Sequence, residues 1–203
     1  MRPTIVSVKD ANNNEVPEDI LKRYTVSTRL KLSGQASKGR KVAIIDNFDE
    51  FLLGEATASS LTGTWELSLT VEVNHYLFFA KALYPVDGSA YSNKRQVYVV
   101  PLISPTLDRV RDSNEQEIPD GHNTSSTQLR LNGKASRGQT VEIFDGSGAS
   151  AVSKGEVTSD VTLGNWMLII TVDRGPHRFY AKSLYHSGAP VYSNVRTLTV
   201  VRP

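Results

Sequence analysis

The residues with the strongest case for binding chemistry are oxygen donors in a loop near the N-terminus. The segment from Asp10 to Glu15 (DANNNE) places carboxylate and amide oxygens at alternate positions, as the opening of a calcium-binding loop does. Such a loop needs glycine at its sixth position and a bidentate glutamate at its twelfth, whereas this chain has Glu15 and Leu21 there. Asp and Asn also form turns by bonding to their own backbone, so we interpret the segment as a turn and predict no metal site.

No spacing of residues in the sequence indicates a catalytic site. The sequence contains no Gly-x-Ser-x-Gly elbow, no phosphate loop and no His-Glu-x-x-His motif. It also has no cysteine, which excludes disulfides, zinc–thiolate sites and thiol catalysis. We therefore expect a protein that is not an enzyme and needs no cofactor. The four histidines are interpreted as residues of turns and strand ends: His75, His122, His177 and His186.

Charge and hydropathy narrow the possible partners. Lys and Arg number 23 against 21 for Asp and Glu, and these charges are scattered along the chain. Because nucleic-acid-binding proteins carry a basic patch or stripe, we expect no nucleic-acid partner. No run of 18 or more apolar residues is present, so membrane insertion is not expected.

The chain is an internal duplication. When the two halves are aligned, 36 of 82 aligned pairs are identical. A period of about 100 residues is too long for a solenoid unit and suits a self-sufficient domain. We therefore predict two domains, at residues 1–101 and 102–203. The three aligned blocks pair Pro3–Pro17 with Pro105–Pro119, Thr28–Asn47 with Thr127–Gly146, and Gly54–Val100 with Gly155–Val201.

The elements that must position any site are β-strands, because apolar residues recur at every second position. Trp65, Leu67, Leu69 and Val71 alternate with polar residues, and the stretch from Trp166 repeats the pattern. Short alternating strands without helical periodicity favour a seven-stranded antiparallel sandwich over a barrel. The strands predicted in the first copy are Thr4–Val8, Thr28–Ala36, Lys41–Asp46, Leu52–Ala58, Gly63–Val71, His75–Tyr84 and Tyr91–Val100.

The two tryptophans and the linker have a structural interpretation. Trp65 and Trp166 could stack on a sugar ring, but they share a strand face with aliphatic residues, so we predict that they lie in the core. The linker Pro101–Pro105 is short and carries two prolines, which favours a stiff joint between the domains. An elongated pair of domains is the resulting expectation.

A series of short motifs runs along each half of the chain. In the first copy they are SVKD from Ser7, LKLSGQA from Leu30, VAIID from Val42, GTW from Gly63, FAKALY from Phe79 and SN from Ser92. These motifs resemble the bacterial immunoglobulin-like (Ig-like) repeats of Pseudomonas-type large surface proteins of the adhesin kind. The resemblance covers nearly the whole chain and rests mainly on turn and core positions. It implies that the fold is all-β, with two tandem Ig-like seven-stranded antiparallel β-sandwich domains.

The resemblance implies a stalk or spacer segment of a larger exported bacterial surface protein, whose partners are neighbouring Ig-like repeats. Arg2–Pro3 is echoed by Arg202–Pro203, as expected for a two-repeat piece of a longer array located at the cell surface or outside the cell. One alternative is a recognition module that binds a glycan or host protein through its end loops. Another is an accessory domain of a secreted toxin or hydrolase. The candidate ligand-binding residues lie where the two copies diverge: Tyr24, Phe48 and Phe51.

Overall fold

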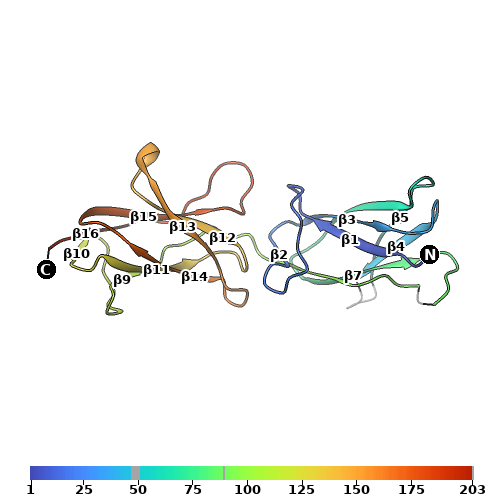
Figure 1. The fold of residues 1–203 in the computed structure, drawn as a ribbon, viewed down its shortest axis with the longest axis horizontal. Coiled ribbons are helices and arrows are strands. Elements are labelled where there is room, and N and C mark those ends of the chain that lie inside the picture. Colours follow the sequence, from blue (N-terminus) through green and yellow to red (C-terminus); the bar gives the residue numbers. More distant parts are fainter. Residues whose placement is uncertain (47–50, 89, 203) are drawn as a thin grey trace. The chain divides into compact units, whose positions relative to one another are not determined.

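The computed structural model describes residues 1–46, 51–88 and 90–202, and this part of the chain consists mainly of β-strands (Figure 1). Contacts divide the chain into two compact units, Met1–Val100 and Pro101–Pro203. Each unit has its own cluster of buried apolar side chains. Among the described residues, no helix is long and apolar enough to span a membrane.

The first unit is a sandwich of two sheets. One sheet has three strands in the order β1-β3-β6, and the other has five in the order β2-β8-β7-β4-β5. All neighbours pair antiparallel except β2 and β8, which are parallel. The strands are β1 (Thr4–Lys9), β2 (Tyr24–Thr25), β3 (Arg29–Gln35), β4 (Lys41–Asp46), β5 (Phe51–Thr57), β6 (Thr64–Thr70), β7 (His75–Ala82) and β8 (Arg95–Val99).

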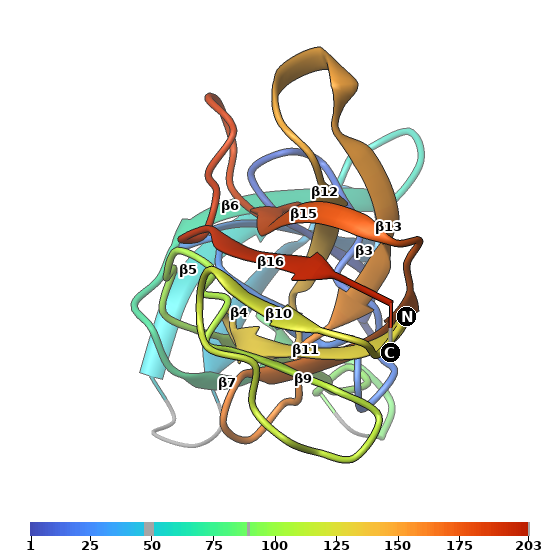
Figure 2. The same cartoon turned by 90° about the vertical axis from the view of Figure 1, so that its left-hand side faces the viewer.

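The second unit repeats this arrangement, with sheets β14-β11-β9 and β10-β16-β15-β12-β13. Figure 2 shows the two layers, with β15 and β16 in one and β9 and β11 in the other. The expected two tandem Ig-like sandwich domains are thereby confirmed. The elements are β9 (Arg109–Arg111), β10 (His122–Thr124), β11 (Gln128–Lys134), β12 (Thr140–Asp145), the 3-10 helix η1 (Gly148–Ser150), β13 (Val152–Thr158), β14 (Asn165–Thr171), β15 (Gly175–Ser183) and β16 (Arg196–Val200).

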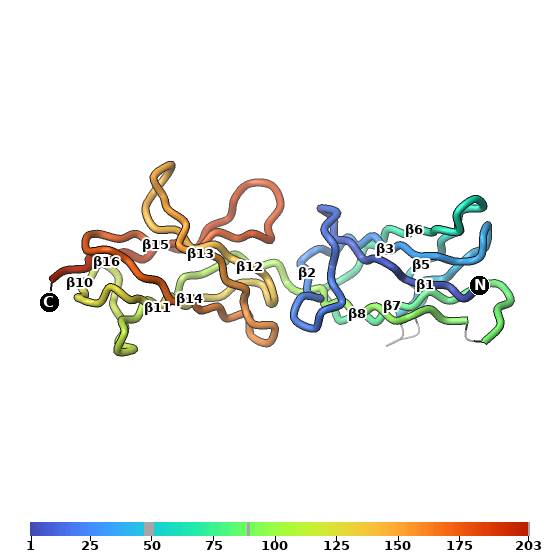
Figure 3. Tube along the Cα trace, in the orientation of Figure 1, coloured from blue at the N-terminus to red at the C-terminus, as the bar shows by residue number. Residues whose placement is uncertain are grey.

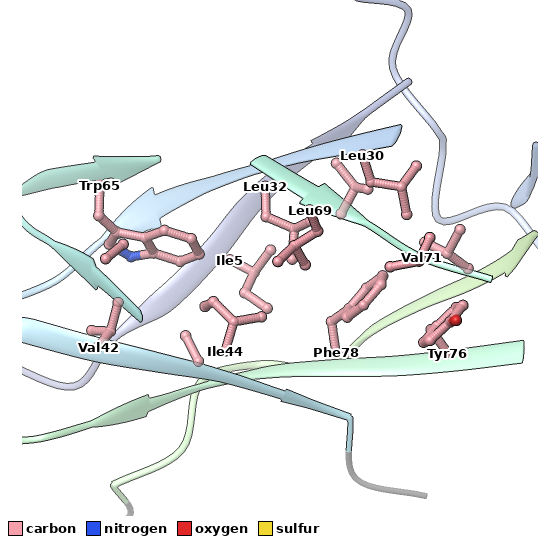
Figure 4. Close-up of a cluster of buried hydrophobic side chains, with 14 of the residues drawn as sticks. Ile5, Leu30, Leu32, Val42, Ile44, Trp65, Leu69, Val71, Tyr76 and Phe78 are labelled. Atoms are coloured by element: carbon pink, nitrogen blue, oxygen red, sulfur yellow. The ribbon is translucent and has the colours of Figure 1, made fainter. Parts of the chain in front are cut away.

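Most of the predicted core positions are confirmed: in strands such as β3, β6 and β7 of the first unit, buried side chains enter the space between the sheets (Figure 4). Trp65 is only 1% exposed, and its indole Nε1 donates a hydrogen bond to the Gln35 carbonyl at 3.2 Å. Trp166 is 2% exposed and makes the same bond to the Lys134 carbonyl at 3.1 Å. Burial of the ring together with a partner for its single donor identifies both tryptophans as core residues.

The repeated Tyr-Ser-Asn motif joins the two sheets of each sandwich. The Asn93 side chain accepts a hydrogen bond from the Ile5 N–H and donates one to the Ile5 carbonyl, both at 2.9 Å. It therefore acts like an extra peptide group beside β1. Asn194 repeats both bonds with Leu107. The neighbouring Ser92 hydroxyl accepts from the Ala80 N–H in β7, so each motif ties two segments to the sandwich.

The strand prediction misses one element in each unit. β2 and β10 are two and three residues long, and they pair parallel to β8 and β16. Within the described residues, each unit therefore has eight strands where seven were predicted, and one strand pair in each unit is parallel. The last predicted strand, Tyr91–Val100, is also too long, because β8 begins at Arg95 and Tyr91 makes only an isolated bridge to Lys81. Ser92 and Asn93 lie before β8, and their side chains form the hydrogen bonds to β7 and β1 described above.

Candidate functional site

Tyr24 lies in an aromatic stack on the outer face of the five-stranded sheet of the first unit. Its ring stacks on Tyr98 with centroids 4.7 Å apart, and Tyr98 stacks on His75 at 3.9 Å. The stack follows the register of the sheet, because Tyr98 pairs with Tyr24 on one side and with His75 on the other. Tyr24 is half-buried in this row, so its ring is one part of a broader aromatic surface.

Phe51, another candidate ligand-binding residue, does not lie beside Tyr24. Phe51 begins β5 and is 65% exposed, while Phe48 falls outside the described residues. β5 and β2 are the two edges of the five-stranded sheet. Four interstrand spacings of about 4.8 Å separate the edge strands by roughly 19 Å. A single small ligand cannot contact both Tyr24 and Phe51.

His75 is the third ring of the stack, and its surroundings lower its pKa. Burial lowers the pKa of His75 below its ordinary value of 6.5, and the nearby Arg23 guanidinium lowers it further, against the opposing effect of the Asp46 carboxylate. Its Nε2 atom contacts the Gln96 amide nitrogen at 2.6 Å. The imidazole, stacked on Tyr98 and in contact with Gln96, is thus a packed part of the sheet surface.

His177 replaces a tyrosine of the first unit and has the same structural role. Its Nδ1 contacts Asp145 Oδ2 at 2.7 Å, and its Nε2 contacts the Asp173 carbonyl at 2.8 Å. At the aligned position Tyr76 donates to the Glu72 carbonyl at 3.1 Å. Both side chains therefore fix the turn that precedes their strand, β7 or β15.

Ser183 and His186 form a serine–histidine pair that the sequence did not suggest. The Ser183 Oγ and His186 Nδ1 atoms are 2.6 Å apart. The same hydroxyl accepts hydrogen bonds from the backbone N–H groups of Tyr185 and His186, and Ser183 is 5% exposed. A buried hydroxyl closing a turn on its own backbone is a local structural device rather than an accessible nucleophile.

The oxygen-rich segment at Asp10 is a turn. Asp10 Oδ1 accepts hydrogen bonds from the backbone N–H groups of Asn12 and Asn14, both at 2.9 Å. Asp112 in the second unit accepts from Asn114 and Gln116 in the same way. The Asp10 and Asp112 carboxylates thus accept hydrogen bonds from the backbone of their own turns. In the described ranges, no group of three or more His, Asp or Glu side chains is placed to hold a metal ion.

A pair of residues in the second unit holds the linker that leads into it. The Ser136 hydroxyl donates to the Pro101 carbonyl at 2.8 Å and accepts from the Ile103 N–H at 3.0 Å. The Tyr185 hydroxyl donates to the Ile103 carbonyl at 2.7 Å. Together these bonds occupy the backbone of Pro101 and Ile103. We call Ser136 and Tyr185 the Ser–Tyr clamp of the second unit.

The first unit has the same clamp, formed by Ser37 and Tyr84. The Tyr84 hydroxyl donates to the Met1 carbonyl at 2.8 Å and accepts from the Ser37 N–H at 3.0 Å. The Met1 amino group donates to Ser37 Oγ at 2.9 Å. Met1 therefore occupies in the first unit the place that Ile103 occupies in the second.

Sequence reasoning missed the clamp residues, although a signal was present. The dipeptides Ala36–Ser37 and Leu83–Tyr84 recur unchanged as Ala135–Ser136 and Leu184–Tyr185. A serine or tyrosine that both copies retain at a turn is a candidate for a hydrogen bond. Here the tyrosine hydroxyls bond to backbone carbonyls that are far away in sequence. Only the folded structure shows which segment that is.

Comparisons with known proteins found similar solved structures at low sequence identity. No protein-family model and no curated protein matches the chain. Fibronectin(III)-like modules of Clostridium thermocellum CbhA are 13% identical, with 98% of this chain and 94% of that chain covered and a TM-score of 0.42. The human OSCAR ligand-binding domain is 11% identical, with 98% of both chains covered and a TM-score of 0.47.

A third similar structure is the BSP domain of a biofilm-associated protein, at 17% identity and a TM-score of 0.30. This match covers 88% of the present chain and 28% of that chain. With TM-scores below 0.5, these similarities carry no argument about a ligand or partner.

Proposed function

We propose that the chain is a non-catalytic spacer of two Ig-like repeats in a larger exported, adhesin-like surface protein, with neighbouring repeats as its partners. The observation that supports this proposal is the Ser–Tyr clamp, which each unit possesses and which binds the segment leading into that unit. A spacer must transmit position along a string of domains, and a linker bonded to the next domain does so better than a flexible tether.

The clamp is suited to this task because it acts on backbone atoms. Ser136 and Tyr185 bind the carbonyls of Pro101 and Ile103, so they hold the linker whatever side chains it carries. Pro101 and Pro105 restrict the linker further by fixing their own φ angles. Repeats of differing linker sequence could therefore be joined by the same device.

Linker mobility tests the proposal. In the wild-type chain we expect the backbone amides of Leu102 and Ile103 to show NMR order parameters of about 0.85, the value of rigid backbone. The double variant Ser136→Ala/Tyr185→Phe removes the bonds to the linker, so these values should fall below about 0.6 while the second unit stays folded.

The first-unit variant Ser37→Ala/Tyr84→Phe is the matched control, because it removes the equivalent clamp without touching the linker. Its Leu102 and Ile103 amides should remain rigid. A linker that is already mobile in the wild-type chain would contradict the spacer proposal.

A further inference from the structure

The outer face of β15 carries a row of aromatic and cationic side chains. His177, Phe179 and Ala181 face inward, so Arg178, Tyr180 and Lys182 point outward at every second position. Phe144 of β12 lies beside Tyr180 with ring centroids 5.6 Å apart and planes at 13°.

On the other side of Tyr180, the Tyr192 ring meets it edge-on, with centroids 5.5 Å apart and planes at 76°. The three rings of Phe144, Tyr180 and Tyr192 form what we call the aromatic shelf.

The cations flank this shelf. The Arg178 guanidinium carbon lies 5.5 Å from the Tyr180 centroid, and Arg178 Nη1 donates to the Gly146 carbonyl at 3.1 Å. The Lys182 Nζ atom lies 6.0 Å from the Phe144 centroid. Neither cation forms an ion pair with a residue in the described part of the chain. Arg178 is thus held in place while most of its donors face outward.

Two rings of the shelf, Tyr180 and Tyr192, line a hollow of about 520 Å³ together with Arg178. The other residues that line this hollow are Gly148, Ser193 and Val195. Small-ligand sites run from roughly 300 to 1,000 Å³, so this volume falls within their usual range. Figure 3 shows the loops at 145–151 and 184–192, both projecting from the second sandwich.

We propose that this hollow binds a carboxylated sugar unit, of the uronic or sialic acid type, in an acidic glycan. Aromatic faces are electron-rich and attract the weakly positive C–H groups of a pyranose ring. Arginine presents a planar fork of donors that matches a carboxylate in two parallel hydrogen bonds. Tyr180 and Tyr192 supply the rings, and Arg178 supplies the fork.

The carboxylate of the bound sugar is expected to lie at the Arg178 end of the shelf. Glu142 stands opposite Lys182 in the register of β12 and β15, so its charge offsets the attraction of Lys182 for an anion. Asp145 is occupied, because it contacts His177 and accepts from the Arg178 N–H at 3.0 Å. Arg178 is therefore the cation best placed to select an acidic ligand.

The first unit provides an internal comparison. At the aligned positions Phe79 and Tyr91 keep the edge-on ring pair, with centroids 6.3 Å apart. Leu77 stands where the second unit has Arg178, and Ile45 stands where it has Phe144. The first unit lacks the guanidinium at this position, so the substitution Arg178→Leu converts the proposed site to the local chemistry of its own homologous repeat.

Titration of the full chain with oligogalacturonate and with a sialylated oligosaccharide tests the proposal, with the neutral oligogalactoside as a matched ligand. We expect saturable binding of at least one acidic glycan and at least tenfold weaker binding of the neutral one. Which acidic glycan binds distinguishes the uronic from the sialic source. Arg178→Leu should weaken binding at least tenfold, the loss expected for about 1.5 kcal/mol of a charge-assisted hydrogen bond.

Matched variants distinguish binding at the proposed site from a general effect of the protein's positive charge. Arg137→Leu removes one exposed cation of the same unit and should bind as the wild type does. Tyr192→Ala should weaken binding, whereas Tyr192→Phe should retain it, and all variants should melt as the wild type does.

Several results would overturn the proposal. These include the absence of saturable binding to either acidic glycan, equal binding of the neutral ligand, equal loss in Arg137→Leu, and unchanged affinity in Arg178→Leu. Single-stranded oligothymidylate is the remaining ligand in the test, because rings and cations also suit stacked bases. Tighter binding of that probe than of the glycans would likewise overturn it.

Discussion

At the scale of single residues, both halves of the chain have a glycine in contact with the buried tryptophan, Gly34 in the first unit and Gly133 in the second. A Cβ atom on Gly34 would lie 1.8 Å from the Thr4 carbonyl oxygen and 2.6 Å from Cζ2 of Trp65. On Gly133 it would lie 1.9 Å from the Thr106 oxygen and 2.5 Å from Cζ2 of Trp166. The closer atom belongs to the backbone, so no side-chain rotation relieves the clash. The glycine is required by close approach.

Gly34→Ala is therefore expected to destabilise the first unit by more than about 3 kcal/mol, beyond the usual cost of overpacking a core. Chemical denaturation followed by near-ultraviolet circular dichroism of the tryptophans measures this loss. Gly39→Ala is the control, because Gly39 has a φ of 68° but nothing within 4 Å of a Cβ atom. Its cost should be about 1–2 kcal/mol, from backbone strain alone. Equal losses in the two variants would contradict the close-approach explanation.

At the scale of elements, the turn between β13 and β14 is organised by one carboxylate. Asp160 Oδ1 accepts hydrogen bonds from the N–H groups of Thr162 at 2.9 Å and Leu163 at 2.6 Å, and Oδ2 accepts from Asn165 at 2.8 Å. Burial raises the pKa of Asp160, but these backbone donors outweigh it and bring the pKa below its ordinary value of 3.8. In the first unit Ser59 closes the same turn with a neutral hydroxyl.

The substitution Asp160→Ser should lower the melting temperature of the second unit by a few degrees at neutral pH. Because the pKa of Asp160 is lowered by folding, its contribution is fully present above pH 3.8 and is lost as the pH falls through the lower folded value. The difference between wild type and variant should therefore stay constant from pH 7 to about pH 4 and shrink below it. Calorimetry across this range checks the prediction, and a difference that grows on acidification would contradict it.

The strands themselves were largely predictable, because alternation reports burial directly. Trp65, Leu69 and Val71 are buried as their period of two requires. β2 was not predictable, since Tyr24 and Thr25 are too few to show a period and pair with β8 far along the chain. A strand of two residues is specified by its partner rather than by its own sequence.

The candidate site was less predictable than the fold. Divergence between the copies pointed to Tyr24 and Phe51, but sequence gives no distance between two edges of one sheet. The aromatic shelf was missed because Phe144, Tyr180 and Tyr192 come from separate segments of the chain, and only the fold brings their rings together.

At the scale of the whole molecule, duplication produced two units with separate cores. Each buried cluster draws its residues from one unit, with Trp65 and Phe78 in the first and Trp166 and Phe179 in the second. The hydrogen bonds of the Ser–Tyr clamp place Pro101 and Ile103 with the second unit. A cut before Pro101 thus leaves each buried cluster within one half of the chain.

Residues 1–100 and 101–203, each expressed alone, should fold cooperatively. Each is expected to show a calorimetric unfolding enthalpy of about 60–80 kcal/mol, the value for a domain of roughly 100 residues, and a van't Hoff enthalpy that agrees with it. The second half should be prepared also from residue 106, without the linker. Removing Pro101 and Ile103 leaves the hydroxyls of Ser136 and Tyr185 without these partners, so this shorter piece should melt a few degrees lower than 101–203. A half that unfolds without a cooperative transition would mean that its core is completed by the other unit.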